Sequence, residues 1–369
     1  MSADQRWMKA AFALGARGLG TVWPNPAVGC ILVKDGRVIG RGWTQPGGRP
    51  HAEVMALRQA GTAARDATAY VTLEPCSHHG KTGPCAEALL TAGIARLVGA
   101  TQDPDPRVAG RGYAMLEEAG VDVTRSCLPE QAEEAHGGFF ARVRTRRPLV
   151  TLKLASSIDG RIATGSGDSR WITGSDARRQ VHMLRSNHDA VLVGTGTMLA
   201  DDPDLGVRGL GPLSDPVRIV ADRRLRMPAN GRLASLAATH AVWALHGPEA
   251  DPARAETLRA LGVKTVEIPT ADGSLELNSL LSILADEGLT RVFCEGGGTV
   301  AASLLASGLI DRLVTFGAGV VIGAEGQPNF GGLGLETLSE APRFTLQSVT
   351  QIGGDIRADW LPIRAKITS

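Results

Sequence analysis

Three side chains in the first quarter of the sequence have the types and spacing of a metal site. His51 stands in the sequence H-A-E, and Cys76 ends the sequence E-P-C. Cys85 follows after eight intervening residues. One imidazole and two thiolates suit Zn²⁺, and three protein ligands leave the fourth tetrahedral position open to water, as a catalytic zinc site requires. The pattern therefore predicts one catalytic zinc ion per chain.

Glu53 lies two positions after the first ligand and is not needed to hold the metal. An H-x-E motif followed by P-C and a second cysteine is typical of zinc deaminases, in which the glutamate moves protons. We expect Glu53 to take a proton from the attacking water and to hand it to the departing amine. Because positions two apart do not share a helix face, His51 must lie at the first turn of a helix that we predict over residues 52–60.

A purely structural zinc site is the alternative at these positions. It would need a fourth ligand, and His78, His79 or Cys30 could supply it. Cys30 lies inside an apolar run, which is more typical of a buried small hydrophobe than of a ligand. Cys127 and Cys294 have no partner at ligand spacing. Glu53 would have no task in a structural site, so the pattern favours the catalytic one.

Three segments of the first half together resemble the deaminase half of the bifunctional riboflavin-biosynthesis deaminase/reductase family. They are PNPAVGC at 24–30, HAEV at 51–54 and PCSHHGKTGPC at 75–85. The long spacing between the cysteines departs from the C-x-x-C of other zinc deaminases. The resemblance implies a cytidine-deaminase-like α/β/α fold and the hydrolytic deamination of 2,5-diamino-6-(5-phosphoribosylamino)pyrimidin-4(3H)-one.

The same resemblance implies roles for two further residues of this half. Asn25 and Lys81 map onto positions that hold the pyrimidine and its ribosyl phosphate. An amide can both donate to and accept from a pyrimidine edge, and a lysine is a point charge suited to phosphate. Family members often carry a histidine seven residues before the zinc histidine, where this chain has Thr44.

The second half carries no further metal motif, but four of its segments resemble the reductase half of the same family. They are KLASSIDGR at 153–161, SRWIT at 169–173, GTGTMLADDP at 194–203 and EGGGT at 295–299. A strict G-x-G-x-x-G fingerprint is absent. The resemblance implies a dihydrofolate-reductase-like domain that uses NADPH to reduce the ribosyl group of 5-amino-6-(5-phosphoribosylamino)uracil to ribityl.

Two sets of residues follow from these motif positions. The first set is implied to bind NADPH: Ala155, Trp171, Thr197, Asp201, Gly297, Gly298, Thr299, Val300, Ala301, Ala302 and Ser303. The second set is implied to bind substrate: Lys153, Ser169, Arg185, Leu205, Arg208 and Glu295. Guanidinium groups match phosphate oxygens in a bidentate way, so Arg185 and Arg208 suit a phosphate. Lys153 could stabilise the alkoxide that forms after hydride transfer.

The elements that must position these residues alternate between strand and helix in both halves. In the first half the patterns predict helices at 6–17, 52–60 and 86–90, and strands at 28–33, 37–42, 69–73 and 96–100. In the second half they predict strands at 149–154, 190–193, 217–221, 241–244, 263–268, 291–294 and 313–316, with helices at 176–185 and 299–307. Such alternation is typical of α/β architecture with a largely parallel sheet in the second domain.

Composition limits the remaining possibilities. The 369 residues predict two to three domains, and an arginine-rich stretch at 142–148 reads as a solvated connector. We therefore divide the chain into a deaminase domain at 1–146 and a reductase domain at 147–369. A formal charge of +1, with 39 basic and 38 acidic residues, argues against nucleic-acid or membrane binding. Five cysteines and no signal-peptide pattern predict a cytoplasmic protein.

Two other functions are compatible with parts of the pattern. The chain could be a nucleoside or tRNA base deaminase with a non-catalytic accessory domain, although near-neutral charge and 4% aromatic residues disfavour a nucleic-acid substrate. It could also be a nucleotide-binding regulatory protein with a closed structural zinc. The family resemblance favours the bifunctional enzyme acting on a phosphoribosylated pyrimidine, and it implies self-association into a homo-oligomer.

Overall fold

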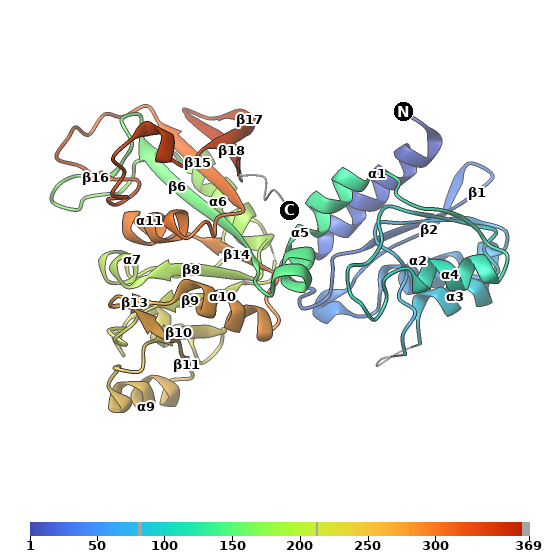
Figure 1. The fold of residues 1–369 in the computed structure, drawn as a ribbon, viewed down its shortest axis with the longest axis horizontal. Coiled ribbons are helices and arrows are strands. Elements are labelled where there is room, and N and C mark those ends of the chain that lie inside the picture. Colours follow the sequence, from blue (N-terminus) through green and yellow to red (C-terminus); the bar gives the residue numbers. More distant parts are fainter. Residues whose placement is uncertain (80–82, 212, 364–369) are drawn as a thin grey trace. The chain divides into compact units, whose positions relative to one another are not determined.

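The protein consists of two compact units, Met1–Arg147 and Pro148–Ser369 (Figure 1). The structure is a computed structural model and describes residues 1–79, 83–211 and 213–363. Helix α5 (Pro129–Thr145) continues through the first four residues of the predicted connector at 142–148, including Arg142 and Arg144, so the connector begins later than predicted. Arginine is a good helix former and is favourable near a helix C-terminus, where the dipole is negative.

The first unit contains a five-stranded sheet of order β2-β1-β3-β4-β5. Its strands are β1 (Gly29–Lys34), β2 (Arg37–Trp43), β3 (Thr68–Val71), β4 (Arg96–Gly99) and β5 (Asp122–Thr124). Strand β1 pairs antiparallel with β2 and β3, whereas β3, β4 and β5 are parallel. The strands predicted at 28–33 and 37–42 form a hairpin, in which Asp35 and Gly36 both lie in the left-handed region that a two-residue turn of this kind requires.

Helices cover both faces of this sheet. On one face, Met8 and Ala11 of α1 (Ala3–Gly15) and Ala132 of α5 pack with strand residues such as Ile31 and Tyr70. The opposite face, with Cys30, Leu32, Ala69, Val71 and Leu97, packs against α2 (Ala52–Ala60), α3 (Cys85–Ala92) and α4 (Arg111–Glu118). Alternate residues of each strand thus serve opposite layers, and the predicted α/β/α arrangement is confirmed.

The second unit is built on a nine-stranded sheet of order β11-β10-β9-β8-β14-β6-β15-β18-β17. The first seven strands of this order are parallel: β11 (Lys264–Glu267), β10 (Val242–His246), β9 (Val217–Ala221), β8 (Ala190–Gly194), β14 (Arg291–Cys294), β6 (Leu149–Ser157) and β15 (Arg312–Ala318). The predicted, largely parallel sheet is confirmed. A C-terminal antiparallel hairpin, β17 (Phe344–Ile352) and β18 (Asp355–Pro362), completes it.

Helices of the second unit pack on this sheet and lead into its loops. One core cluster joins Val191 and Val193 of β8 to Ala177 and Val181 of α6 (Ser175–Ser186). The cluster also includes residues of α7 (Thr195–Asp201), α8 (Arg232–Leu236) and α9 (Pro252–Ala260). Two further helices are α10 (Leu277–Asp286) and α11 (Gly298–Ala306). Two short ribbons, β7 (Arg161–Ala163) with β16 (Gln327–Pro328) and β12 (Thr270–Ala271) with β13 (Ser274–Leu275), lie outside the main sheet.

Several boundaries differ from the predictions for physical reasons. Helix α1 begins three residues earlier than predicted because Ser2 and Gln5 form a reciprocal capping box. Helix α7, whose N-cap is Gly194, was not predicted. Helix α4 and the C-terminal hairpin were not predicted. In the described part of the chain, no helix combines the length and apolar character needed to cross a membrane.

Candidate functional site

The three predicted zinc ligands lie at the starts or ends of secondary-structure elements. His51 is the N-cap of α2, at the helix start where the motif requires it. Cys76 follows β3, and Cys85 is the first residue of α3. Helix α2 packs so closely on β2 that a Cβ atom at Gly40 or Gly42 would overlap with the backbone carbonyl groups of the helix. These two glycines therefore let the helix that follows His51 approach the sheet closely.

The donor atoms of the three residues converge. The Sγ atoms of Cys85 and Cys76 lie 3.3 Å and 3.7 Å from Nδ1 of His51, and all three donor atoms lie within 4.8 Å of one another. One ring nitrogen and two sulfurs at such separations fit a tetrahedral zinc site with one open position. His78, His79 and Cys30 are not part of this group in the described residues. His79 Nε2 instead lies 3.0 Å from Glu87 Oε1, and Cys30 of β1 lies in the hydrophobic core.

The two thiols differ in their electrostatic surroundings. A hydrogen bond from Cys85 lowers the pKa of Cys76 to about 4, and contacts with His51 and the Cys85 amide add to this effect. The same hydrogen bond, together with burial, raises the pKa of the Cys85 thiol. The backbone N–H of Cys85 donates to Cys76 Sγ at 3.3 Å. The first N–H of α3 thus stabilises the thiolate of Cys76 rather than that of Cys85.

Glu53 lies in the first turn of α2, beside this group. Its side chain is only 3% exposed, and burial raises its pKa above the ordinary value. A buried carboxyl whose proton affinity is increased suits proton transfer to and from a reacting group. The structure therefore brings together the whole predicted constellation of His51, Glu53, Cys76 and Cys85.

The predicted pyrimidine and phosphate contacts are placed less completely. Asn25 packs against Gly48, where a Cβ atom would overlap with the Asn25 amide, and Gly48 lies three residues before His51. Lys81 lies outside the described residues. Thr44 is buried, and its hydroxyl accepts a hydrogen bond from the Val28 amide at 3.0 Å. Thr44 therefore braces the start of the sheet in this chain.

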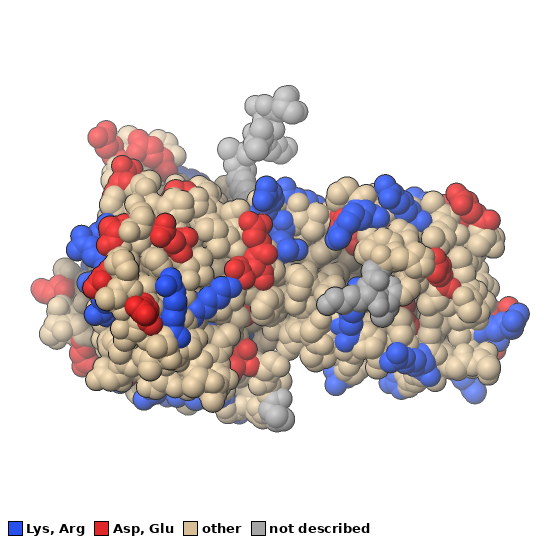
Figure 2. Space-filling view, turned by 90° about the horizontal axis from the view of Figure 1, so that it is seen from below, with Lys and Arg blue, Asp and Glu red and all other residues tan. Residues whose placement is uncertain are grey.

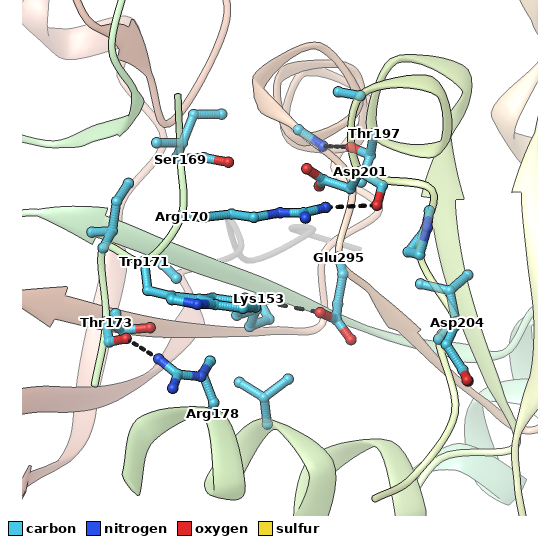
Figure 3. A pocket seen from close by; sticks show the side chains of 18 of the residues that line it. Lys153, Ser169, Arg170, Trp171, Thr173, Arg178, Thr197, Asp201, Asp204 and Glu295 are labelled. Carbon is cyan, nitrogen blue, oxygen red and sulfur yellow. Dashed lines mark hydrogen bonds and ion pairs between the residues drawn. The ribbon is translucent and has the colours of Figure 1, made fainter. Parts of the chain in front are cut away.

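A cavity of about 930 Å³ lies in the second unit (Figure 3). Its walls come from β6, the loop at 169–173, α6, α7, the loop at 201–208 and the segment 295–297. Eleven of the predicted reductase residues line it: Lys153, Ala155, Ser169, Trp171, Arg185, Thr197, Asp201, Leu205, Arg208, Glu295 and Gly297. A cavity of this size can hold part of a dinucleotide cofactor together with a small substrate.

The predicted residues of α11 are placed differently. Gly298, Thr299, Val300, Ala301, Ala302 and Ser303 are not among the residues that line this cavity. Ala301 and Ala302 are buried in the unit's interior, while Val300 packs against Gly194 and Gly296. Only Gly297, the N-cap of α11, reaches the cavity, and its amide donates to Thr197 Oγ1 at 3.2 Å.

A charge network of largely buried side chains lines the cavity. Arg185 Nε donates to Glu295 Oε1 at 2.5 Å, and Lys153 Nζ lies 3.9 Å from Glu295 Oε2. Burial alone would raise the pKa of Glu295, but Arg185 and Lys153 hold it below the ordinary value. Burial lowers the pKa of Lys153, although Glu295 opposes that shift. The network thus keeps a carboxylate ionised next to a lysine whose proton is more easily released.

Some residues of the cavity were not predicted. Arg178 lies 4.4 Å from the ring centroid of Trp171, and Arg170 donates to the carbonyl oxygen of Asp201 at 2.7 Å (Figure 3). The spacing of Arg178, His182 and Arg185, at i, i+4 and i+7, places all three on one face of α6. That spacing was the signal in the sequence that could have linked Arg178 to the predicted substrate residue Arg185. Trp171 is 70% exposed, so the arginine below it helps to hold an otherwise free indole ring.

Comparison with protein families assigns both units. Residues 1–101 match the cytidine and deoxycytidylate deaminase zinc-binding region, and residues 148–358 match the RibD C-terminal domain. The first match coincides with the three-donor group and the second with the large cavity. The chain is therefore an enzyme of the class that joins a zinc-binding deaminase domain to a reductase domain.

Full-length relatives define the family. RibD of Escherichia coli, a riboflavin biosynthesis protein, is 42% identical over 96% of this chain and 98% of its own. A solved structure of Acinetobacter baumannii RibD is 40% identical, covers 98% of this chain and 99% of its own, and has a TM-score of 0.88. A Thermotoga maritima diaminohydroxyphosphoribosylaminopyrimidine deaminase/5-amino-6-(5-phosphoribosylamino)uracil reductase is 34% identical, with the same coverages and a TM-score of 0.85.

This chain belongs to the RibD family of bifunctional riboflavin-biosynthesis enzymes. Its cofactors are zinc in the deaminase domain and NADPH in the reductase domain. These findings bear out the bifunctional prediction and disfavour a base deaminase with a non-catalytic accessory domain.

Proposed function

We propose that residues 1–146 convert 2,5-diamino-6-(5-phosphoribosylamino)pyrimidin-4(3H)-one into 5-amino-6-(5-phosphoribosylamino)uracil, and that residues 147–369 reduce its ribosyl group to ribityl. The convergence of His51, Cys76 and Cys85 beside the buried carboxyl of Glu53 carries the proposal for the first step. The similarity to the Thermotoga maritima deaminase/reductase supports both substrates. One zinc ion per chain would be held by the three converging donors.

Glu53 is the acid–base group of the first step in this proposal. Bound zinc supplies a Lewis acid that makes water a stronger nucleophile near neutral pH. The water oxygen bonds to ring carbon C2, which carries the amino group that the product lacks. The bond between C2 and this nitrogen breaks, and ammonia leaves. Glu53 accepts a proton from the water and returns it to the departing nitrogen. Its burial excludes bulk water from this transfer.

Asn25 and Lys81 complete the proposed substrate site of the first domain. Asn25 would hydrogen-bond the pyrimidine edge, and Gly48 keeps its amide beside the segment that leads to His51. Lys81 would meet the phosphate.

Lys153 is the central residue of the proposed second step. When bound, NADPH would supply the hydride for the carbonyl carbon of the ring-opened ribosyl group, whose oxygen must also gain a proton. Lys153 would stabilise the developing charge and deliver that proton, because burial lowers its pKa. Glu295 and Arg185 fix its surroundings through the buried network.

The remaining cavity residues divide between cofactor and substrate in this proposal. Ala155, Trp171, Thr197, Asp201 and Gly297, which line the cavity, would contact NADPH, and Ser169, Leu205 and Arg208 would contact substrate. The cofactor role of Gly298 to Ser303 on α11, which do not line the cavity, stays a prediction. On the part of the surface that Figure 2 shows, acidic side chains lie among the basic ones. We further propose a cytoplasmic homo-oligomer without a nucleic-acid or membrane partner.

The two steps can be tested with one substrate and two readouts. Zinc-loaded protein is given the diaminopyrimidine phosphate, first alone and then with NADPH. We expect ammonia release without NADPH and consumption of NADPH only after the ring has been deaminated. Ammonia release from cytidine or from tRNA, but not from the diaminopyrimidine phosphate, would contradict the proposal.

A further inference from the structure

Arg218 is a fully buried arginine that lies behind one wall of the reductase cavity. It is carried by β9, and its side chain is 2% exposed. Its Nε donates to the carbonyl oxygen of Asp204 at 2.8 Å. Its Nη2 donates to Asp215 Oδ2 at 2.9 Å and to Asp204 Oδ1 at 3.3 Å. Arg218 is not itself among the residues that line the cavity.

The loop at 204–208 is fastened to this arginine through the two carboxylates. Asp204 Oδ1 accepts from the Gly206 amide, and Asp215 Oδ1 accepts from the Val207 amide, both at 2.8 Å. Leu205 adopts a positive φ of 63°, which is unfavourable for a residue with a side chain. Contacts to charged groups must therefore hold the loop in this conformation.

Gly206 shows how closely the loop approaches the guanidinium group. A Cβ atom at this position would lie 2.5 Å from Arg218 Nη2 and 2.6 Å from Asp204 Oδ1. Real Cβ atoms essentially never come so near, so the site accepts no side chain here without a shift. The backbone at Gly206 therefore rests directly on the charged group behind it.

The cavity side of the same loop carries the proposed substrate contacts. Leu205 and Arg208 line the cavity, as does Asp204 (Figure 3). Arg185 Nη1 donates to the Gly206 carbonyl oxygen at 2.9 Å, and the Arg208 amide donates to His182 Nδ1 at 3.3 Å. The loop is thus held between Arg218 behind it and Arg185 in front of it.

The charges behind the loop are matched. Burial alone would raise the pKa of both Asp204 and Asp215, but the loop amides and Arg218 hold them below their ordinary value. His240 lies 3.3 Å from Asp215 on the outer side. A buried guanidinium with two ionised partners is costly to assemble and resists disruption, because removing one partner leaves a buried charge uncompensated. Such a group fixes a conformation rather than merely adding stability.

We propose that Arg218 is a positioning residue of the reductase: it holds the loop at 204–208 so that Leu205 and Arg208 present a fixed binding surface to the phosphate-bearing substrate. The proposal rests on the proposed function, which places substrate at these residues. Arg218 acts on substrate affinity through the loop, and it leaves NADPH binding on the other walls of the cavity unaffected.

Replacement of Arg218 by lysine tests this role. The variant keeps one positive charge but cannot reproduce the forked contacts to Asp204 and Asp215. We expect the KM for 5-amino-6-(5-phosphoribosylamino)uracil to rise at least about tenfold, while kcat stays within about threefold and the Kd of NADPH within about twofold. The Gly206→Ala variant, which pushes the loop off the guanidinium, is expected to show the same split.

Arg254→Lys is the matched control. Arg254 also holds a loop by donating to backbone carbonyl groups, those of Leu225 and Met227, but neither residue lines the cavity. We expect its substrate KM to match that of the unaltered protein. Equal changes of substrate KM and NADPH Kd in Arg218→Lys, or a rise in substrate KM as large in Arg254→Lys, would overturn the proposal.

Hydrogen exchange tests the anchor independently of turnover. Local opening governs the protection of the Gly206, Val207 and Arg208 amides. These amides should therefore exchange at least about tenfold faster in Arg218→Lys than in the unaltered protein, and their exchange rates should be unchanged in Arg254→Lys. Unchanged protection in Arg218→Lys would overturn the positioning role even if the unaltered protein failed to reduce the proposed substrate. If the unaltered protein failed to reduce the proposed substrate, the proposed function would be overturned. The exchange rates would still decide whether Arg218 holds the loop at 204–208.

Discussion

The two candidate sites are built in opposite ways. The zinc group of the first unit uses three donors from two short segments, each at the start of a helix or just after a strand, within 4.8 Å of one another. The reductase cavity has a volume of about 930 Å³ and takes its walls from segments spread over more than 140 residues. The zinc site depends on three donor atoms, whereas the reductase cavity depends on the placement of many side chains.

This difference determines how each site should respond to mutation. A metal site concentrates its chemistry in donors that no other side chain replaces. A wide cavity spreads its binding energy over many contacts, and its critical points are the buried charges that hold the walls, such as Glu295. We therefore expect all-or-none effects in the first unit and graded effects in the second.

The largest effect is expected from Glu53→Gln. The amide cannot move a proton, so ammonia release should fall about 10³-fold or more, within the range for general acid–base groups. Zinc content and NADPH-dependent reduction of supplied 5-amino-6-(5-phosphoribosylamino)uracil should be unchanged. Glu117→Gln, on the outer helix α4, is the control. Loss of reduction together with deamination would contradict the separation of the two sites.

The next effect is expected from Cys85→Ser. Loss of one of three protein ligands should weaken zinc binding by more than the 10–100-fold that outer-shell changes typically cost. Zinc retained after dialysis against a chelator measures this loss directly. Cys127→Ser, at a cysteine outside the donor group, should keep its zinc. Equal zinc content in the two variants would exclude Cys85 as a ligand.

The same difference explains what the sequence could predict. His51, Glu53, Cys76 and Cys85 were all identified, because their side chains have few other uses at such spacing. Strands were predicted well where runs of buried apolar residues marked them, as in β9 and β14. Helix α1 was predicted to start too late, since the capping box at Ser2 and Gln5 was overlooked.

Residues whose roles depend on tertiary placement were harder to predict. Arg178 and Arg218 are ordinary in the sequence, and only the fold brings one to Trp171 and the other behind the loop at 204–208. Two residues of α11, Ala301 and Ala302, were assigned to the cofactor by motif position alone. Both are buried in the structure, so their contact with NADPH stays a prediction.

A smaller effect is expected from Glu295→Gln in the second unit. The change leaves Arg185 and Lys153 as buried cations without their carboxylate, which should cost about 3 kcal/mol of local stability. Reduction should fall while ammonia release is unchanged. Glu249→Gln, which removes a partly exposed pair with Arg223, should cost less than about 1 kcal/mol. Hydrogen exchange of β14 and α6 measures the cost, and equal destabilisation by both variants would contradict the structural importance of the network.

The smallest effect concerns the acid sensitivity of the two units. Burial lowers the pKa of His188, in the second unit, to about 3 from 6.5. The contribution of neutral His188 to the free energy of unfolding is fully present above pH 6.5. It is lost as the pH falls towards 3, by about 1.4 kcal/mol per pH unit. In the first unit, the hydrogen bond from Arg96 lowers the pKa of Asp4 below 3.8, so that contribution is lost only in more acidic solution. Between pH 7 and 5.5, protection factors, which are corrected for the slower intrinsic exchange at lower pH, should therefore fall more in the second unit than in the first. His188→Gln should flatten this pH dependence, because the neutral amide has no proton to gain, and an unchanged slope in the variant would show that another group controls it.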